Sequence, residues 1–498
     1  MTKTNKVVWG WTGMSHDASL AVYVNKRLVF ASHSERYSRI KNDKNLHHDL
    51  INEALEFGKP EKVYFYENTF LKKTRQLYAK QYSLLTKQSP TSHMRSFYPD
   101  APKSIPTAHH RSHAAAGFYT SPFSDAAILV VDSIGEWETI SIWHGEDNNL
   151  KRIHKQNYPN SIGIWYSAMT QRIGLKPQEH EYILMGMAAI GDKERLYKRI
   201  KRDFIKKMPT IDDGNVIFKQ NCHRGCLDWA TDLRTPQDYA DIAAATQRIY
   251  EEIFQGLVRY TAKLLPKTRN IVVMGGCALN CKANSIAYKN FSQVWIMPNP
   301  GDAGSAIGAP LAHWDQHVRW PGAYLGHNID GNYPVDQIIN ELKENRITAV
   351  AAGRAEFGPR ALGNRSILAD PRGDDVKDLV NSIKQREAFR PFAPAILEEY
   401  ASDYFDGHTG PYMQYTAWCK DTEKFPAIIH YDGSSRVQTV NQRDNPGFRK
   451  LLERWYEETG CPMLLNTSLN IKGEPLVNTR TDAERWSEKY GVKICLPE

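Results

Sequence analysis

The chain has 498 residues, of which 41% are hydrophobic and 24% are charged, as in an ordinary globular protein with a full core. This length predicts more than one domain, and the absence of any run of about 18 apolar residues excludes a membrane span. The formal net charge of +8 is modest for this length, so it fits a protein that binds anionic small ligands and does not indicate nucleic-acid binding.

The N-terminal segment MTKTNKVVWGWTG enters a strand-like apolar run without the apolar region and small-residue cleavage site of a signal peptide. We therefore expect a cytoplasmic protein. The seven cysteines, an odd number, indicate reduced thiols. Cys222 and Cys226 are separated by three residues and have His223 beside them, so a metal site there remains an alternative.

The first segments predict strands joined by short turns. VVWGWTGMSHDASLAVYV (7–24) has apolar runs on both sides of a Gly/Ser turn, and KRLVFASH (26–33) predicts a further strand. A helix over 46–58 and a strand in KVYFYEN follow. ILVVDSIGEWETISIWHG (128–145) repeats the order of buried strand, acidic residue, small-residue turn and second strand. We therefore expect two related halves within one domain.

The middle of the chain predicts alternating helices and strands. Residues 238–264 have apolar residues at i, i+3, i+4 and i+7, which indicates a long amphipathic helix. NIVVMGGCALNCKANS (270–285) predicts a strand that ends in Gly-Gly and opens a helix, and QVWIMPNPGDAGSAIGAP (293–310) predicts a strand, a Pro/Gly loop and a helix. Near 319–334 the pattern breaks into Gly, Pro, Asn and Tyr, so we expect a domain boundary there.

Two histidines and two aspartates are candidate metal ligands. His109 and His113 share one face if their segment is helical, which supplies half of a divalent metal site, although a satisfied core or surface pair also has this spacing. Asp132 ends the buried strand ILVVD, and Asp302 lies in the glycine-rich NPGDAGSA. Carboxylates at strand ends in α/β folds face the ligand crevice. The four side chains predict a site for Fe²⁺, Mn²⁺, Zn²⁺ or Mg²⁺.

The segment MGGCALN (274–280) is a candidate nucleotide-binding turn. Gly275 and Gly276 come at a strand-to-helix turn, where backbone can approach a nucleotide and phosphate can lie near a helix N-terminus. A plain tight turn is the alternative. Because strand, acid and turn units precede it and PGDAGSA follows, we favour a nucleotide cleft with Gly275, Gly276 and Asn280 as its residues.

Cations gather in EFGPRALGNRSILADPR (356–372) and KQREAFRPFAP (384–394). Arginine forks match phosphate and carboxylate oxygens, and glycine allows a close backbone approach. A solvated basic surface is the alternative. Here the cations are interleaved with core-type residues such as Phe357 and Phe392, so the pattern predicts a pocket for an anion. The cations are Arg354, Arg360, Arg365, Arg372, Lys384, Arg386 and Arg390.

These motifs give the chain a resemblance to a known family. It resembles the O-carbamoyltransferases that modify nodulation factors, cephalosporins and aminoglycosides such as tobramycin. The resemblance runs nearly end to end, and the pair of arginine-rich motifs is its most specific part. The matching segments, in the family's order, are SHDAS, SERYSRIKND, HHRSHAAAGFY, GGCALNCKAN, PGDAGSAIGA, EFGPRALGNRSILADPR, REAFRPFAP, SSRVQTV and LNTSLNIKGEP.

The resemblance implies an α/β fold with two domains. Residues 1–320 would form an actin-like domain of the sugar-kinase and Hsp70 type, made of two related halves. Residues 321–498 would form a YrdC-like α+β domain. It also implies two reactions: carbamoyl phosphate and ATP give carbamoyl-adenylate and pyrophosphate, and the hydroxyl of a small-molecule acceptor then takes the carbamoyl group as AMP leaves. A sugar, a nucleoside or a secondary metabolite would serve as acceptor.

Carried over by motif position, the resemblance implies roles for individual residues. The metal, with Fe²⁺ favoured, would be held by His109, His113, Asp132 and Asp302. The site for carbamoyl phosphate and ATP would use Arg360, Lys384, Arg390 and Arg436, with Asn466 and Ser468 in the NTS loop.

His16, in the turn MSHDAS, is a candidate general base because it should face the same cleft as the metal ligands. A turn histidine bonded to Asp17 or to backbone is the alternative. Two other functions also remain: threonylcarbamoyl-type transfer to tRNA, and sugar phosphorylation by a kinase of the actin-like type. A membrane partner is not expected, nucleic acid is disfavoured, and homo-oligomers are left open.

Overall fold

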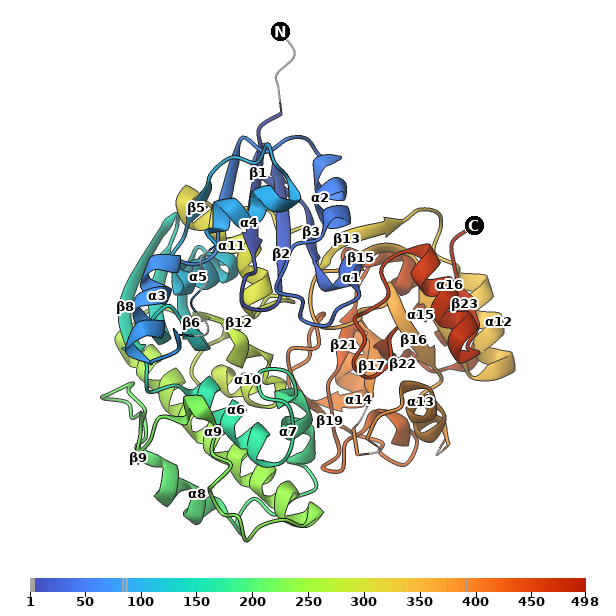
Figure 1. Cartoon of the computed structure of the whole chain (residues 1–498). Helices are drawn as coiled ribbons and strands as arrows, with labels where there is room; N and C mark the ends of the chain where they lie inside the picture. The colour runs from blue at the N-terminus through green and yellow to red at the C-terminus, as the bar shows by residue number, and fades with distance from the viewer. Residues whose placement is uncertain (1–4, 83–84, 86–87, 374, 388, 391) are drawn as a thin grey trace.

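The first sheet is built from the N-terminal strands, in the order β3-β2-β1-β4-β5 (Figure 1). The structure is a computed structural model that describes residues 5–82, 85, 88–373, 375–387, 389–390 and 392–498. Strands β1, β2 and β3 pair antiparallel, and β4 and β5 continue the sheet in parallel with β1. The strands are β1 (Val7–Thr12), β2 (Ser19–Val24), β3 (Arg27–His33), β4 (Lys62–Phe65) and β5 (Ser104–Pro106).

The second sheet repeats this arrangement of strand directions. Its order is β12-β11-β6-β7-β8: β6, β7 and β8 pair antiparallel, and β11 and β12 continue in parallel with β6. The predicted repetition of the strand–acid–turn–strand unit is therefore present in the sheet topology. The strands are β6 (Asp125–Gly135), β7 (Glu138–Glu146), β8 (Asn149–Asn157), β11 (Asn270–Met274) and β12 (Gln293–Trp295).

Two helices lie between these sheets and share one core with them. Apolar residues of α5 (His109–Thr120) and α11 (Ser305–Trp314) pack with residues of β2 and β6. The helices cross closely at Gly308, where an added Cβ would lie 1.8 Å from the Ser112 carbonyl oxygen. This crossing brings the first turn of α5 next to the first turn of α11, so residues far apart in sequence meet there.

The outer side of the second sheet is covered by helices. The long helix α9 (Pro236–Leu264) has the predicted amphipathic pattern and begins at a capping box formed by Thr235 and Asp238. It shares a core with α6 (Ile162–Arg172). The other helices of the N-terminal half are α1 (Glu35–Ser38), α2 (His48–Leu55), α3 (Thr69–Tyr78), α4 (Pro90–Phe97), α7 (Glu181–Met187), α8 (Tyr197–Phe204) and α10 (Cys281–Asn284).

The C-terminal residues build a third sheet with a core of its own, drawn from residues 329–495. The sheet is mixed, in the order β21-β17-β22-β16-β14-β23, with strands β14 (Ile347–Ala351), β16 (Arg365–Ala369), β17 (Ala393–Leu397), β21 (Gln438–Val440), β22 (Met463–Ser468) and β23 (Ile494–Cys495). Its longer helices are α12 (Val335–Asn345), α13 (Val376–Lys384), α15 (Pro446–Thr459) and α16 (Arg480–Tyr490). The whole chain is thus α/β with mixed sheets, and Figure 1 places this third sheet beside the N-terminal pair.

The Gly-Gly turn differs from its prediction. Gly275 has φ of +90°, and an added Cβ would lie 2.2 Å from the Val131 carbonyl oxygen, so a glycine is required. The turn does not open a long helix: it continues as a 3₁₀ turn (Gly276–Leu279) and the four-residue helix α10. Among the described helices, none is both long enough and apolar enough to cross a membrane.

Candidate functional site

The four predicted metal ligands meet in the structure. His109 and His113 are one turn apart on α5, Asp132 lies in β6, and Asp302 begins the turn that leads into α11. The Nε2 atoms of the two histidines are 3.1 Å apart. His109 Nε2 is 3.2 Å from Asp132 Oδ2, and His113 Nε2 is 3.3 Å from Asp302 Oδ1. One ligand atom from each residue lies within 4.8 Å of every other, and all four side chains are buried or nearly so.

The electrostatics of this group follow from its burial. Burial disfavours the charged form of His109, yet the Asp302 and Asp132 carboxylates outweigh it and raise the pKa of His109 well above its usual value. The pKa of Asp302 is lowered well below its usual value, because His109 and His113 overcome the effect of burial. Two anions beside two imidazole nitrogens that face each other form a donor set that fits a divalent cation.

Neighbouring groups hold the ligands in place. Ser305 Oγ lies 3.2 Å from His113 Nδ1, which leaves Nε2 of that ring to face the other ligands. The backbone amide of Gly276 donates to Asp132 Oδ1 at 3.0 Å. Gly276 therefore fixes a candidate metal ligand directly. The predicted nucleotide residue Asn280 is buried and exchanges hydrogen bonds with Gln247.

His16 lies at the edge of the same group, as predicted. Its side chain is 45% exposed, with Nε2 3.5 Å from Asp302 Oδ2. Its Nδ1 is also 3.2 Å from Asp17 Oδ2, so the alternative turn contact is present as well. Although burial opposes the charged form, Asp17 and Asp302 raise the pKa of His16 to about 9. The ring therefore carries a proton at neutral pH in this arrangement. A general base must be neutral, so His16 has to lose this proton before it can act as one, and a cation bound beside Asp302 would favour that loss.

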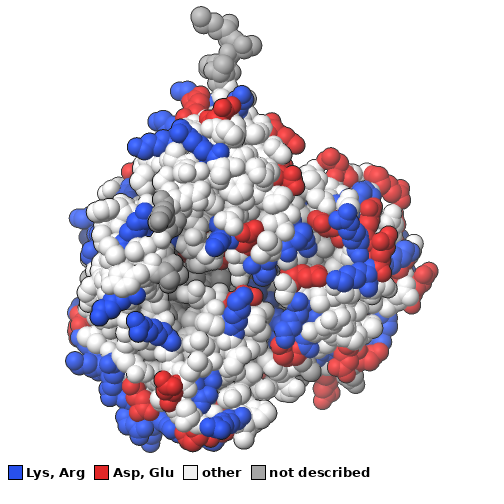
Figure 2. Space-filling model, in the orientation of Figure 1, with Lys and Arg blue, Asp and Glu red and all other residues white. Residues whose placement is uncertain are grey.

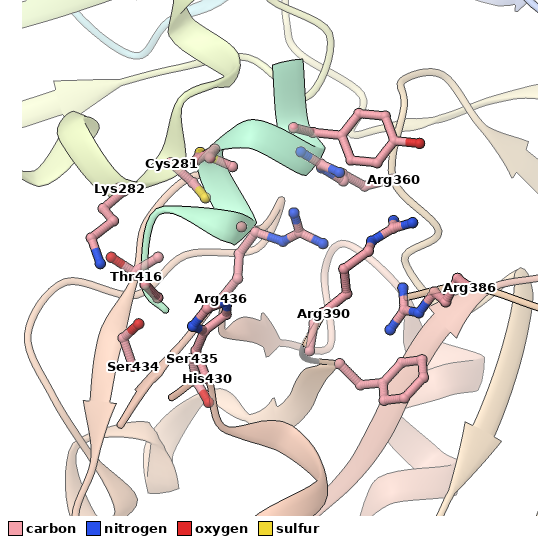
Figure 3. Close-up of a pocket in the computed structure, with 16 residues that line it drawn as sticks. Cys281, Lys282, Arg360, Arg386, Arg390, Thr416, His430, Ser434, Ser435 and Arg436 are labelled. Carbon is pink, nitrogen blue, oxygen red and sulfur yellow. The ribbon is translucent and has the colours of Figure 1, made fainter. Parts of the chain in front are cut away.

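A second site, which we call the arginine pocket, lies between the two halves of the chain (Figure 3). One wall comes from α7 and α10 of the N-terminal half and the other from the C-terminal residues. Figure 3 shows arginine side chains on one side of the cavity and Cys281 and Lys282 on another. The lining residues are Tyr182, Met185, Gly186, Ala189, Cys281, Lys282, Arg360, Arg386, Arg390, Phe392, Ala393, Thr416, His430, Ser434, Ser435 and Arg436.

The cations of the arginine pocket repel one another. Burial, together with the nearby Arg436 and Arg390, lowers the pKa of Arg360 to about 9. Burial and the same kind of repulsion lower the pKa of Arg386 well below its usual value, and its guanidinium carbon lies 3.9 Å from the centre of the Phe392 ring. An anion in the pocket would relieve this repulsion, so the pocket fits a phosphate-bearing ligand.

Three other arginines of the predicted cluster serve the fold. Arg365 is fully buried and donates to the backbone carbonyls of five residues, at 3.0–3.1 Å. Arg354 donates to the carbonyls of Leu325 and Gly326, and Arg372 pairs with Asp370. The expectation that the whole stretch lines an anion pocket is therefore wrong for these three, because backbone carbonyls or a carboxylate already satisfy them.

Arg365→Ala should destabilise the protein by about 2–3 kcal/mol, because buried carbonyls would lose their donor. Denaturant unfolding of the full chain measures this. Arg372→Ala is the matched control: Arg372 is partly exposed, so a loss of less than about 1 kcal/mol is expected. Equal losses for the two variants would contradict the structural role of Arg365.

Lys384 contacts Ser468, and Asn466 lies two residues before Ser468 in β22, but none of the three is in the described lining of the arginine pocket. Lys384 Nζ donates to Ser468 and Asn470 at 2.6–3.0 Å, and burial lowers the pKa of Lys384 well below its usual value. Asn466 Nδ2 donates to Gln438 Oε1 at 2.7 Å. In this arrangement Lys384 ties the NTS loop to α13.

The comparisons with known proteins bear on both sites. The family pattern described as Carbamoyltransferase N-terminus matches residues 65–311, and the pattern described as Carbamoyltransferase C-terminus matches residues 339–496. The chain belongs to the carbamoyltransferase family. It is therefore a carbamoyltransferase enzyme, and the N-terminal match contains the histidine–aspartate group while the C-terminal match contains the pocket arginines.

Three relatives illustrate the range of this family. The uncharacterized protein sll1178 of Synechocystis is 34% identical, over 78% of this chain and 74% of that protein. Nodulation protein NolO of Bradyrhizobium diazoefficiens is 30% identical, over 75% of each chain. The 3'-hydroxymethylcephem-O-carbamoyltransferase of Amycolatopsis lactamdurans is 27% identical, over 96% of this chain and 95% of that enzyme. The acceptors of this carbamoyltransferase are not fixed by these likenesses.

Several pocket residues were not predicted from the sequence. Cys281 and Lys282 come from α10, and His430 comes from the turn before β20 (Ser434–Ser435). The motif GGCALNCKAN contained the first two without indicating that they face the C-terminal half. His430 had no signal of spacing, because its neighbours in the pocket come from other parts of the chain.

Proposed function

We propose that this carbamoyltransferase is an O-carbamoyltransferase that activates carbamoyl phosphate with ATP in the arginine pocket and transfers the carbamoyl group at the histidine–aspartate site. The acceptor would be a hydroxyl of a small molecule. The observation that carries the proposal is the cluster of mutually repelling cations at Arg360, Arg390 and Arg436. Two polyanions must come together during activation, and fixed cations stabilise that arrangement.

The proposed activation consumes water and releases inorganic phosphate as well as pyrophosphate. Water attacks the carbonyl carbon of carbamoyl phosphate, so that carbamate and inorganic phosphate form. A carbamate oxygen then attacks the α-phosphorus of ATP, pyrophosphate leaves, and carbamoyl-adenylate results. In the second step the acceptor oxygen attacks the carbamoyl carbon and AMP leaves with the bonding electron pair. The acceptor loses one proton, which a neighbouring base must take.

The histidine–aspartate site is proposed to hold a divalent cation, with Fe²⁺ favoured and Mn²⁺, Zn²⁺ or Mg²⁺ as alternatives. Imidazole and carboxylate ligands suit these ions. When bound, the cation would neutralise phosphate charge and orient the carbonyl group. The protein's own part is to hold His109, His113, Asp132 and Asp302 in one buried group and to place His16 at its edge.

The domain assignment belongs to the same proposal. Residues 1–320 are proposed to be an actin-like domain and residues 321–498 a YrdC-like domain. The repeated sheet topology supports two related halves in the first, and a separate core supports independence of the second. Basic and acidic residues are interspersed on the face in Figure 2, which favours small-molecule substrates over tRNA on that face.

Product analysis tests the proposal directly. The purified full chain, supplied with ATP and a divalent metal, should release pyrophosphate only when carbamoyl phosphate is added. Formation of ADP with a sugar and without carbamoyl phosphate would instead indicate a sugar kinase. Mass spectrometry of candidate acceptors after incubation identifies the hydroxyl that is carbamoylated.

His16→Ala should slow carbamoyl transfer by about 10²–10⁴-fold while pyrophosphate release stays nearly intact. The reason is position: His16 is 3.5 Å from Asp302, and it is absent from the described lining of the arginine pocket. Single-turnover assays of the two half-reactions measure this. Proportional loss of both activities would point to a folding defect or a shared site, and unchanged transfer would remove His16 from the reaction.

A further inference from the structure

His430 is a residue of the arginine pocket that has no role in the proposed reaction. Its side chain lines the arginine pocket and is 8% exposed. Both ring nitrogens are buried and neither makes a well-formed hydrogen bond: the Gly186 backbone offers one ring nitrogen a weak contact, and Nδ1 is 4.0 Å from Asp432 Oδ1. At least one buried ring nitrogen therefore lacks a partner, which is costly unless a ligand satisfies it.

The backbone at His430 is held in a tight turn. The amide of His430 donates to the Ser434 carbonyl at 2.8 Å, and the amide of Gly433 donates to the His430 carbonyl at 2.9 Å. Gly433 has φ of +75°, so this tight turn depends on a glycine. The turn places His430 beside Ser434, Ser435 and Arg436, all of which also line the pocket. The backbone that carries the imidazole is therefore set in position beside the pocket.

The cations of the pocket can only donate hydrogen bonds. Arginine and lysine side chains carry hydrogen-bond donors and no acceptor. The hydroxyls of Ser434 and Ser435 donate to Asp432 Oδ1 and to the Ile428 carbonyl, so toward a ligand they keep only oxygen lone pairs, and they are acceptors beside His430. Burial and the nearby Lys282 and Lys377 outweigh Asp432 and lower the pKa of His430 to about 4, so the ring is neutral at pH 7 and keeps one nitrogen lone pair.

We propose that His430 is a specificity-determining residue whose free ring nitrogen accepts a hydrogen bond from the amino group of the carbamoyl substrate. This inference rests on the proposed function. The arginines bind the phosphate but cannot distinguish carbamoyl phosphate from acetyl phosphate, which has a methyl group in place of the amino group. An acceptor placed beside them makes that distinction, because a site built to pair a polar group rejects an analogue that lacks it. The adenine amino group of ATP is a second donor, so the test includes the nucleotide.

The experiment measures binding of carbamoyl phosphate, acetyl phosphate and ATP to the full chain by calorimetry. We expect wild type to prefer carbamoyl phosphate over acetyl phosphate by about tenfold, the value of one hydrogen bond. His430→Phe keeps a ring and removes both nitrogens. It should lose this preference by weakening carbamoyl phosphate alone, with acetyl phosphate and ATP unchanged, which also reports that the pocket is folded. His408→Phe, in an exposed ring stacked on Tyr288, is the matched control and should keep the preference.

Several results would overturn the inference. A wild type without the preference, or a His430→Phe variant that retains it, removes the proposed hydrogen bond. Equal weakening of all three ligands indicates a general loss of the pocket, and weakening of ATP alone assigns the ring to the nucleotide. If wild type still releases pyrophosphate from ATP in the presence of carbamoyl phosphate, only the inference fails. If wild type binds none of the ligands and releases no pyrophosphate, the proposed function fails with it.

Discussion

Arg360→Ala is expected to slow pyrophosphate release by about 10²–10³-fold, a loss of about 2.7–4 kcal/mol in the transition state. Arg360 lies at the centre of the repelling cations, next to Arg436 and Arg390, and it also lines a smaller cavity that borders the arginine pocket. Removing its fixed charge leaves the two polyanionic substrates less well neutralised. Initial rates with carbamoyl phosphate and ATP measure the effect.

Two further variants serve as controls for the Arg360→Ala result. Arg360→Lys keeps a charge and loses the planar pair of donors, so its rate should fall between those of wild type and alanine. Arg443→Ala removes an arginine whose side chain is 84% exposed, and it should leave the rate unchanged. Equal rates for Arg360→Ala and Arg443→Ala would show that activation does not depend on the charge of Arg360 in the pocket.

His113→Ala is expected to remove bound metal and to slow carbamoyl transfer by at least about 10²-fold. The side chain is fully buried, and its Nε2 faces His109 and Asp302. Without it the site loses one imidazole ligand, and the two carboxylates remain with less compensation. Metal analysis of the purified protein gives the first readout, independent of activity.

The control for His113 is His144→Ala. His144 pairs with Asp125 at 2.8 Å, is partly exposed and lies on β7 away from the ligand group. It should keep its metal content and transfer rate. Equal metal content in wild type and His113→Ala would show that His113 is not a metal ligand and that the two histidines have a structural role.

The sequence predicted most of the histidine–aspartate group because the pattern of three of its residues is local. Spacing of four residues places His109 and His113 on one face of α5, and a buried strand ends at Asp132. Bringing Asp302 to them required the close crossing of α11 and α5 at Gly308, which no local pattern encodes. The general rule that carboxylates at strand ends face the ligand crevice, together with the resemblance to a family, supplied that link.

The arginine-rich stretch was harder to interpret for a physical reason. Arg360 and Arg365 are five residues apart and of one type, yet Arg360 lines the pocket while Arg365 is buried among backbone carbonyls. Composition cannot distinguish an arginine that lines the pocket from one that supports the fold, because each role depends on which segments fold around the side chain. The role of Lys384 in the site for carbamoyl phosphate and ATP, which came from the resemblance, stays a prediction: in the structure its Nζ is held by Ser468 and Asn470.

The separation of activation from transfer is the central claim, and one measurement tests it most directly. Pyrophosphate release is followed without acceptor, with carbamoyl phosphate and ATP, in wild type, Arg360→Ala and His113→Ala. The two-site account predicts carbamoyl phosphate-dependent release in wild type and His113→Ala, and a loss of about 10²-fold or more in Arg360→Ala. No release by wild type with any divalent metal, or equal loss in both variants, would contradict it.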